Sequence, residues 1–153
     1  MICWVADPEE LRQVAQICQD LSEGLKNRAV FNWTASQLME EAQFSKILIK
    51  KNFSKEIVSF LAYRELPDNL EIMALGTRHG SLRQGYQGLL LAELKNIAFL
   101  DRKDIFLEVH ERNDEARQLY QKWGFEVIGR RLQYYTDQGA AVVIAFKSEK
   151  ILN

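Results

Sequence analysis

The chain has 153 residues and a formal net charge of −1, with 47% hydrophobic and 27% charged residues. This is the composition of a globular protein, and it excludes a disordered or fibrous chain. The near-neutral charge argues against nucleic acid as the main partner, because binding to phosphates requires a basic surface. We expect one domain over residues 1–153, since this length suits a single domain with its own core.

The N-terminal residues lack the basic start and long apolar stretch of a signal peptide, and no apolar run has the length of a membrane span. Cys3 and Cys18 form neither a C-x-x-C pair nor a zinc-type spacing with His79 and His110. We therefore expect a cytoplasmic protein with reduced, buried thiols, no metal and no membrane partner. Both histidines are expected on the surface.

The N-terminal half can be divided into elements from the spacing of its apolar residues. Residues 1–6 are predicted to form a short strand. Asp7 and Pro8 begin a helix, because Asp is a good N-cap and Pro suits the first helical position. Thr34 is placed to cap a second helix. Three strands are predicted next, at 46–50, 56–63 and 70–77.

The C-terminal half alternates between helices and strands. A polar loop at 78–84 leads into a helix from Gly85 to about Phe99, and a strand follows at 105–110. Asn113 opens another helix, which ends at Gly124, a residue favoured just after a helix. Two final strands are predicted at 125–128 and 140–146. This order of elements predicts a mixed α/β domain with a central sheet covered by helices.

The segment from Thr77 to Gly88 joins a predicted strand to a helix and contains three glycines and two arginines. The first N–H groups of a helix lack internal partners and carry a partial positive charge. Such a segment can bind a phosphate. It matches neither the P-loop nor the G-x-G-x-x-G pattern, so an ordinary glycine-containing loop remains an alternative.

From this loop to Tyr135 the chain resembles the GNAT superfamily of acetyl-CoA-dependent N-acetyltransferases. Residues 107–125 match the family pattern L-E-V-x-x-x-N-x-x-A-x-x-L-Y-x-x-x-G-F at every fixed position. Residues 82–87 are similar to the family's [Q/R]-x-x-G-x-[G/A] loop, with Gly85 in place and Leu82 and Gln87 differing. The paired arginines and tyrosines at 130–135 are most similar to the bacterial RimI-type ribosomal-protein-alanine N-acetyltransferases.

The resemblance implies a GNAT fold, with a central mixed sheet and about four helices, and acetyl-CoA as cosubstrate. It implies that Glu108 is the general base and Tyr120 the general acid. It also implies a set of cofactor-binding residues on one strand, the following loop and the start of a later helix: Leu75, Gly76, Thr77, Arg83, Gln84, Gly85, Tyr86, Gln87, Gly88 and Asn113.

The chemistry is consistent with these roles. Attack on a thioester needs a neutral amine, and a peptide α-amine, with a pKa near 8, is a few hundredfold richer in the neutral form at pH 7 than lysine, near 10.4. A modest base such as Glu108, acting directly or through a water, is therefore sufficient. Tyr120 is protonated at pH 7 and can donate a proton to the leaving thiolate.

Taken singly, these residues have structural alternatives: Glu108 as a surface acid, Tyr120 as a core residue and Asn113 as a helix cap. Three functions stay open. The protein acetylates the N-terminus of another protein, for example a ribosomal protein; or it acetylates a small amine; or it binds coenzyme A without catalysis. Recognition of the acceptor is expected from residues 23–34 and 130–140.

Overall fold

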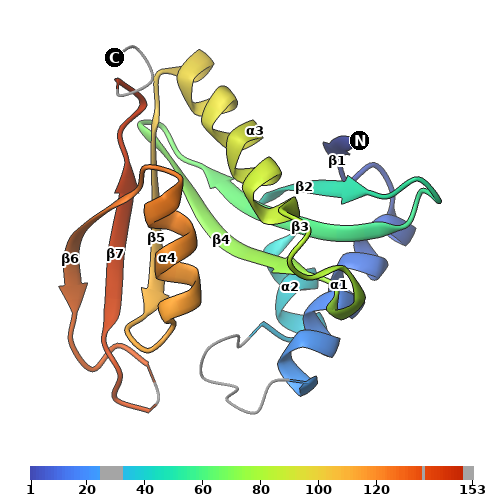
Figure 1. Ribbon diagram of the computed structural model, residues 1–153, viewed down its shortest axis with the longest axis horizontal. Coiled ribbons are helices and arrows are strands. Elements are labelled where there is room, and N and C mark those ends of the chain that lie inside the picture. Colours follow the sequence, from blue (N-terminus) through green and yellow to red (C-terminus); the bar gives the residue numbers. More distant parts are fainter. Residues whose placement is uncertain (25–32, 136, 150–153) are drawn as a thin grey trace.

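The computed structural model describes residues 1–24, 33–135 and 137–149, and it contains a seven-stranded mixed sheet (Figure 1). The order of strands across the sheet is β1-β2-β3-β4-β5-β7-β6, and every neighbouring pair is antiparallel except β4 and β5. The strands are β1 (Ile2–Trp4), β2 (Lys46–Lys51), β3 (Ile57–Glu65), β4 (Asn69–Thr77), β5 (Asp104–His110), β6 (Glu126–Arg131) and β7 (Ala141–Phe146).

The described residues also form four α-helices, so the predicted mixed α/β fold class is confirmed. The helices are α1 (Pro8–Gly24), α2 (Ala35–Glu41), α3 (Tyr86–Asp101) and α4 (Asp114–Lys122), and a short 3₁₀ turn precedes α3 at His79–Ser81. No helix in this part of the chain combines the length and the apolar character needed to cross a bilayer.

The helices begin where the sequence predicts, because their caps form. The Glu10 amide donates to Asp7 Oδ1 over 2.8 Å at the start of α1. Thr34 and Gln37 form a reciprocal capping box at the start of α2. Asn113 accepts from the Ala116 amide over 3.1 Å at the start of α4. These side chains satisfy N–H groups that have no partner inside the helix.

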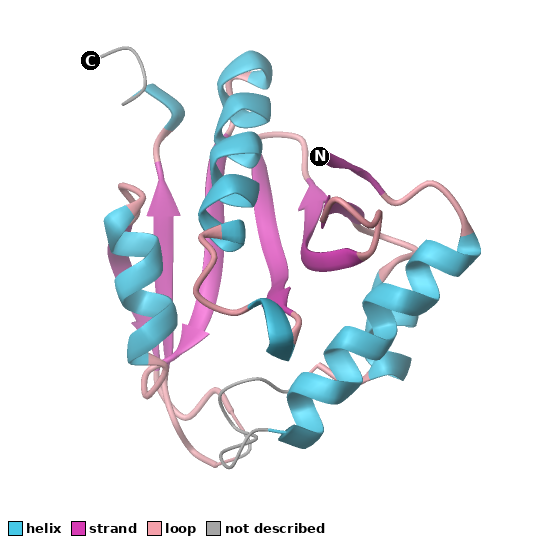
Figure 2. Ribbon diagram, turned by 45° about the vertical axis from the view of Figure 1, so that its right-hand side comes forward, coloured by secondary structure: helices cyan, strands magenta, loops and turns pink. Residues whose placement is uncertain are grey.

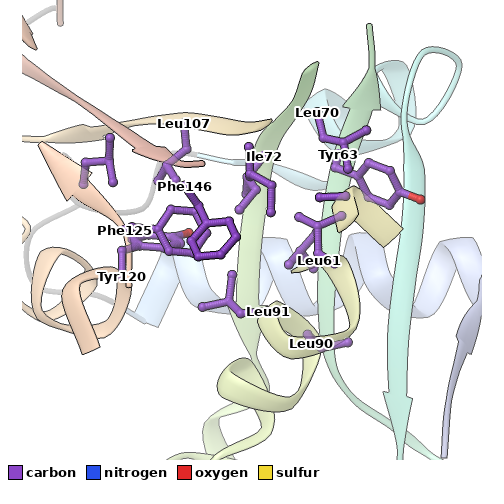
Figure 3. Packing of buried hydrophobic residues seen from close by; sticks show 14 of the residues in the cluster. Leu61, Tyr63, Leu70, Ile72, Leu90, Leu91, Leu107, Tyr120, Phe125 and Phe146 are labelled. Atoms are coloured by element: carbon purple, nitrogen blue, oxygen red, sulfur yellow. The ribbon is translucent and has the colours of Figure 1, made fainter. Parts of the chain in front are cut away.

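Helices cover both faces of the sheet, and a separate hydrophobic cluster fills each interface (Figure 2). The first cluster joins α3 and α4 to one face (Figure 3), and the second joins α1 and α2 to the other. Leu107 and Val109 of β5 belong to the first cluster. Because side chains alternate along a strand, Glu108 and His110 point to the opposite face.

The parallel strands β4 and β5 are paired only over their first halves. The register runs from Asn69 opposite Asp104 to Ile72 opposite Leu107 and then stops. Beyond that point both strands continue but diverge, as Figure 1 shows. An irregularity between β3 and β4 leaves Met73 as an extra residue of β4, and such a bulge bends a strand. The divergence opens the sheet near its centre.

Candidate active site

A cleft of about 890 Å³ occupies the place where β4 and β5 part. Its base is formed by the diverging strands. Its walls come from α2, the start of α4 and the tyrosine loop, by which we mean the described part of residues 132–140 between β6 and β7. Among the residues that line it are Glu71, Leu75, Glu108, His110, Asn113, Tyr120, Tyr134 and Tyr135.

Glu108 points into this cleft from β5, and its side chain is 19% exposed. Its carboxylate forms an ion pair with Arg131, at the end of β6, with 3.0 Å between Oε1 and Nε. Compared with the alternative of a surface acid, Glu108 is largely buried, with part of its side chain still exposed. The carboxylate is thus held by a guanidinium from β6, two strands away in the sheet, and remains partly exposed in the cleft.

Tyr120 comes from α4 and is only 4% exposed. Its ring packs edge-on against Phe125 with 5.3 Å between centroids, as part of the first hydrophobic cluster (Figure 3). Burial raises the pKa of the Tyr120 hydroxyl well above its ordinary value. The residue therefore belongs to the core and also lines the cleft, where its hydroxyl stays protonated at neutral pH.

Tyr134 and Tyr135 face Glu108 from the tyrosine loop. The negative charge of Glu108 is the main cause that raises the pKa of Tyr134. Burial, with a further contribution from Glu108, raises the pKa of Tyr135 to about 12. The two rings also pack edge to face, with centroids 5.1 Å apart. Two neutral hydroxyl groups therefore lie beside one carboxylate at the mouth of the cleft.

His110 is not on the surface, so that prediction was wrong. The residue is 3% exposed, and its ring stacks on Tyr135 with 4.8 Å between centroids. It is buried because the tyrosine loop folds back over the end of β5, an arrangement that periodicity along β5 cannot reveal. His79, in contrast, is exposed, as predicted.

The strand predicted to bind the cofactor is the end of β4, and its edge toward β5 is not paired with β5 there. Leu75 lines the cleft, while Gly76 and Thr77 are buried. Ser59 of β3 donates its hydroxyl to the Gly76 carbonyl over 2.8 Å and lies 2.9 Å from the Thr77 hydroxyl. On the other side, the pairing with β5 has already ended at Ile72. A peptide-like ligand could pair with this edge of β4.

The predicted phosphate loop lies at the start of α3, outside the lining of the cleft. Gly85 adopts a left-handed conformation with φ of 77°, and Arg83 does so with φ of 61°. Both residues are exposed. The loop residues placed at this helix start are Arg83, Gln84, Gly85, Tyr86, Gln87 and Gly88.

Gly88 differs from the other loop residues because it is buried. A Cβ atom at this position would lie 2.5 Å from Cζ2 of Trp123, so the glycine allows α3 to approach the end of α4. A packing role thus accompanies the role predicted for Gly88 in cofactor binding.

Elsewhere in the described residues, a hollow of about 1120 Å³ lies between α3, α4 and β6, and neither Glu108 nor Tyr120 lines it. The same residues contain no group of three or more His, Cys, Asp or Glu side chains placed to hold a metal ion. The cleft at the divergence of β4 and β5 is therefore the site that brings a carboxylate and a buried phenol together.

Solved structures similar to this one include N-acetyltransferases. The ribosomal-protein-S18-alanine N-acetyltransferase from Escherichia coli is 19% identical, with a TM-score of 0.75 over 95% of this chain and 93% of that chain. Ard1 from Thermoplasma volcanium is 18% identical, with a TM-score of 0.76 over 95% of each. An aminoglycoside 6'-N-acetyltransferase complexed with coenzyme A is 11% identical, with a TM-score of 0.78 over 97% of each. No curated protein matches the chain significantly.

A family model gives the class of protein, which is an acetyltransferase. The model of the Acetyltransferase (GNAT) family matches residues 9–125, which is most of the chain. The protein belongs to the GNAT acetyltransferase family, and the resemblance noted in its sequence is confirmed at that level.

Proposed function

We propose that this GNAT acetyltransferase transfers the acetyl group of acetyl-CoA to the N-terminal α-amine of a protein. The observation that carries the proposal is the placement of Glu108 and Tyr120. They lie on opposite sides of the sheet, yet both line the cleft where β4 and β5 part. A donor held on the α3–α4 side and an acceptor held on the α1–α2 side would meet between them.

In the proposed reaction the amine nitrogen attacks the thioester carbonyl carbon, and the carbon–sulfur bond breaks. Glu108 accepts the proton that the amine loses, directly or through a water. Tyr120 donates its proton to the departing thiolate of coenzyme A. The raised pKa of Tyr120 supports this role, because the hydroxyl still holds its proton at neutral pH.

Cofactor binding is proposed for the residues that the family pattern assigns. The free edge of β4 at Leu75, Gly76 and Thr77 would pair with the amide groups of the pantetheine arm. The loop from Arg83 to Gly88 would hold the pyrophosphate at the start of α3, where helical N–H groups point outward. Asn113, which also caps α4, would hydrogen-bond the coenzyme.

A protein N-terminus is favoured over a small amine by the acceptor side of the cleft. This side is open and bordered by Tyr134 and Tyr135, whose hydroxyl groups can bind a peptide backbone. The E. coli enzyme named above, whose acceptor is an alanine of a ribosomal protein, supports the same assignment. Residues 23–34 were also predicted to recognise the acceptor, and 25–32 of these lie outside the described residues.

The test is a kinetic comparison of acceptors followed by two substitutions. The protein is offered acetyl-CoA with short peptides that differ in their first residue, and with spermidine and an aminoglycoside. We expect a peptide with a small first residue to be acetylated fastest. Glu108→Gln and Tyr120→Phe should each lower kcat/KM by about 10²- to 10⁴-fold, with unchanged acetyl-CoA binding.

The matched control is Glu9→Gln, which alters an exposed carboxylate on α1 and should leave turnover unchanged. Preferential acetylation of spermidine or the aminoglycoside would replace the peptide with a small amine as acceptor. Binding of acetyl-CoA without turnover of any acceptor would indicate a non-catalytic coenzyme A-binding module. Full activity of both variants would refute the assigned acid and base.

A further inference from the structure

We propose that His110 and Asp137 are positioning residues that hold the tyrosine loop over Glu108 and thereby set the affinity for the acceptor. This inference rests on the proposed function for its kinetic readout. The hydrogen bond that defines the pair joins His110 Nε2 to Asp137 Oδ2 over 2.8 Å. It connects the end of β5 to the loop between β6 and β7 across 27 residues of sequence.

The protonation of His110 follows from its second partner. The Arg112 amide donates to His110 Nδ1 over 3.0 Å, so Nδ1 accepts and carries no proton. The proton of the neutral ring must then reside on Nε2, from which it is donated to Asp137. Both ring nitrogens are thus engaged within the protein, so His110 is not placed to act as a base toward an acceptor.

Asp137 uses both carboxylate oxygens as acceptors. While Oδ2 receives the His110 proton, Oδ1 accepts from the Gly139 amide over 2.8 Å. The Gly139 carbonyl in turn accepts from the Tyr134 and Tyr135 amides, over 3.1 and 3.2 Å. The carboxylate therefore connects the buried histidine to the backbone that carries the two tyrosines.

Close packing shows that the contact tolerates little displacement. A Cβ atom on Gly139 would lie 2.4 Å from His110 Nε2, so this residue can only be glycine without a shift of the loop. The Tyr135 ring stacks on the His110 ring, and Tyr135 and Tyr134 line the cleft beside Glu108. Movement of the histidine or the loop would therefore displace both tyrosines relative to the carboxylate.

Two substitutions test the proposal through different atoms. Asp137→Asn keeps only one acceptor oxygen for two donors, His110 Nε2 and the Gly139 amide. The His110 ring cannot move its proton to Nδ1 and accept from the new amide group, because Nδ1 already accepts from the Arg112 amide. Gly139→Ala instead places a methyl group against His110. The control is Asp68→Asn, which changes an exposed carboxylate in the turn between β3 and β4.

Two readouts are measured for each variant. The first is amide hydrogen exchange at Tyr134, Tyr135 and Gly139, followed by NMR. The second is steady-state kinetics with acetyl-CoA and a short peptide that begins with alanine. Each of the two variants should exchange these amides at least about tenfold faster and raise the peptide KM about tenfold. The acetyl-CoA KM and kcat should change by less than about threefold.

The outcomes separate this inference from the proposed function. Unchanged exchange in both variants overturns the positioning role, whatever the acceptor is. Faster exchange with an unchanged peptide KM also overturns it, because the position of the tyrosine loop then has no effect on the affinity for the acceptor. If the unaltered protein acetylates no peptide, the proposed function fails, and the exchange measurement alone decides whether His110 and Asp137 hold the loop.

Discussion

At the scale of single residues, Tyr120 combines two requirements. Its ring fills the core against Phe125, and the residue also lines the cleft in which acetyl transfer is proposed. The same burial that stabilises the core disfavours the phenolate. This position therefore suits the proton donor that we propose Tyr120 to be, because the hydroxyl keeps its proton at neutral pH.

The raised pKa of Tyr120 has a measurable consequence in alkali. The folded protein should retain the Tyr120 proton above pH 10, where an unfolded tyrosine ionises. The contribution of Tyr120 to stability is thus full below about pH 10 and is lost as the pH rises toward its folded value. The measurement is an alkaline titration followed by tyrosinate absorbance at 295 nm. The native protein and Tyr120→Phe should show the same increase in absorbance until they unfold, because folded Tyr120 does not ionise.

The control for this titration is the urea-unfolded chain, in which all five tyrosines are expected to ionise near pH 10. A smaller signal for Tyr120→Phe in the folded state near pH 10 would show that Tyr120 ionises normally, in contradiction to its burial.

The neighbourhood of His110 marks the limit of prediction for single residues. The pattern of residues 107–125 predicted Glu108, Asn113 and Tyr120 as site residues, because each lies at a fixed position of one continuous segment, and all three line the same cleft. His110 lies in the same segment, but its partners Asp137 and Gly139 come from a distant loop. No periodicity within β5 reports that this loop covers it.

At the scale of elements, one ion pair fastens α2 to the sheet. Arg64 of β3 donates to both carboxylate oxygens of Glu41, over 2.5 and 2.7 Å, and the Ser45 hydroxyl adds a third contact. Glu41 is buried, and these hydrogen bonds, led by those from Arg64, hold its pKa below the usual range. The pair also forms one wall of the cleft.

Glu41→Gln should therefore destabilise the protein by about 1–2 kcal/mol at pH 7, because the Arg64 charge remains partly buried without its partner. A carboxyl group whose pKa is lower in the folded protein stabilises the fold at a pH above its pKa in the unfolded chain, near 4.3. This contribution is lost as the pH falls through the pKa of the folded state. In urea unfolding, the difference in the free energy of unfolding between native protein and variant should be smaller at pH 4 than at pH 7.

The neighbouring exposed residue gives the control: Glu40→Gln should change the free energy of unfolding by less than about 0.5 kcal/mol. An equal loss in both variants, or a loss for Glu41→Gln that stays constant with pH, would argue against the ion pair as the cause.

The close approach of α3 to the end of α4 at Gly88 leads to a second prediction for the elements. Gly88→Ala should cost about 1–3 kcal/mol, because the added methyl meets the Trp123 indole. In a Trp123→Leu background the same change should cost less, since the obstructing ring is gone. Gly129→Ala, where a Cβ atom meets nothing within 4 Å, serves as the control in urea unfolding.

The elements themselves were largely predictable, because local signals agree with the fold. Caps at Asp7, Thr34 and Asn113 and the stop at Gly124 fixed the helix ends. The bulge at Met73 was not predictable, because it depends on how β3 pairs with β4 rather than on either strand alone. That bulge belongs to the strand that opens the cleft.

At the scale of the whole molecule, two hydrophobic clusters share one sheet, and the cleft lies where the sheet is incomplete. The GNAT family match and the order of elements made this architecture predictable from sequence motifs. The depth of the divergence between β4 and β5 was not predictable, because the register of a parallel pair leaves no local signal.

A ligand that binds this gap should stabilise the folded protein as a whole. Acetyl-CoA at about 100 times its Kd adds about 2.7 kcal/mol by mass action. For a chain of this size that corresponds to a rise in Tm of roughly 5–11 °C in differential scanning calorimetry. Acetyl phosphate, which carries the acetyl group without the coenzyme, should give no shift. An unchanged Tm with acetyl-CoA at millimolar concentration would contradict cofactor binding.

The sheet ends at β6, a strand that is exposed along nearly all its length and carries Val127 and Ile128. Such a border is a template on which another chain could polymerise. Two features of β6 oppose such polymerisation. The register with β7 is interrupted beside Ile128, and two arginines, Arg130 and Arg131, lie at the end of the strand. Arg131 also orients Glu108. The residue that pairs with the proposed general base thus also lies at the border where self-association must be prevented, so a change at Arg131 would affect both the proposed acid–base chemistry and the solubility of the protein.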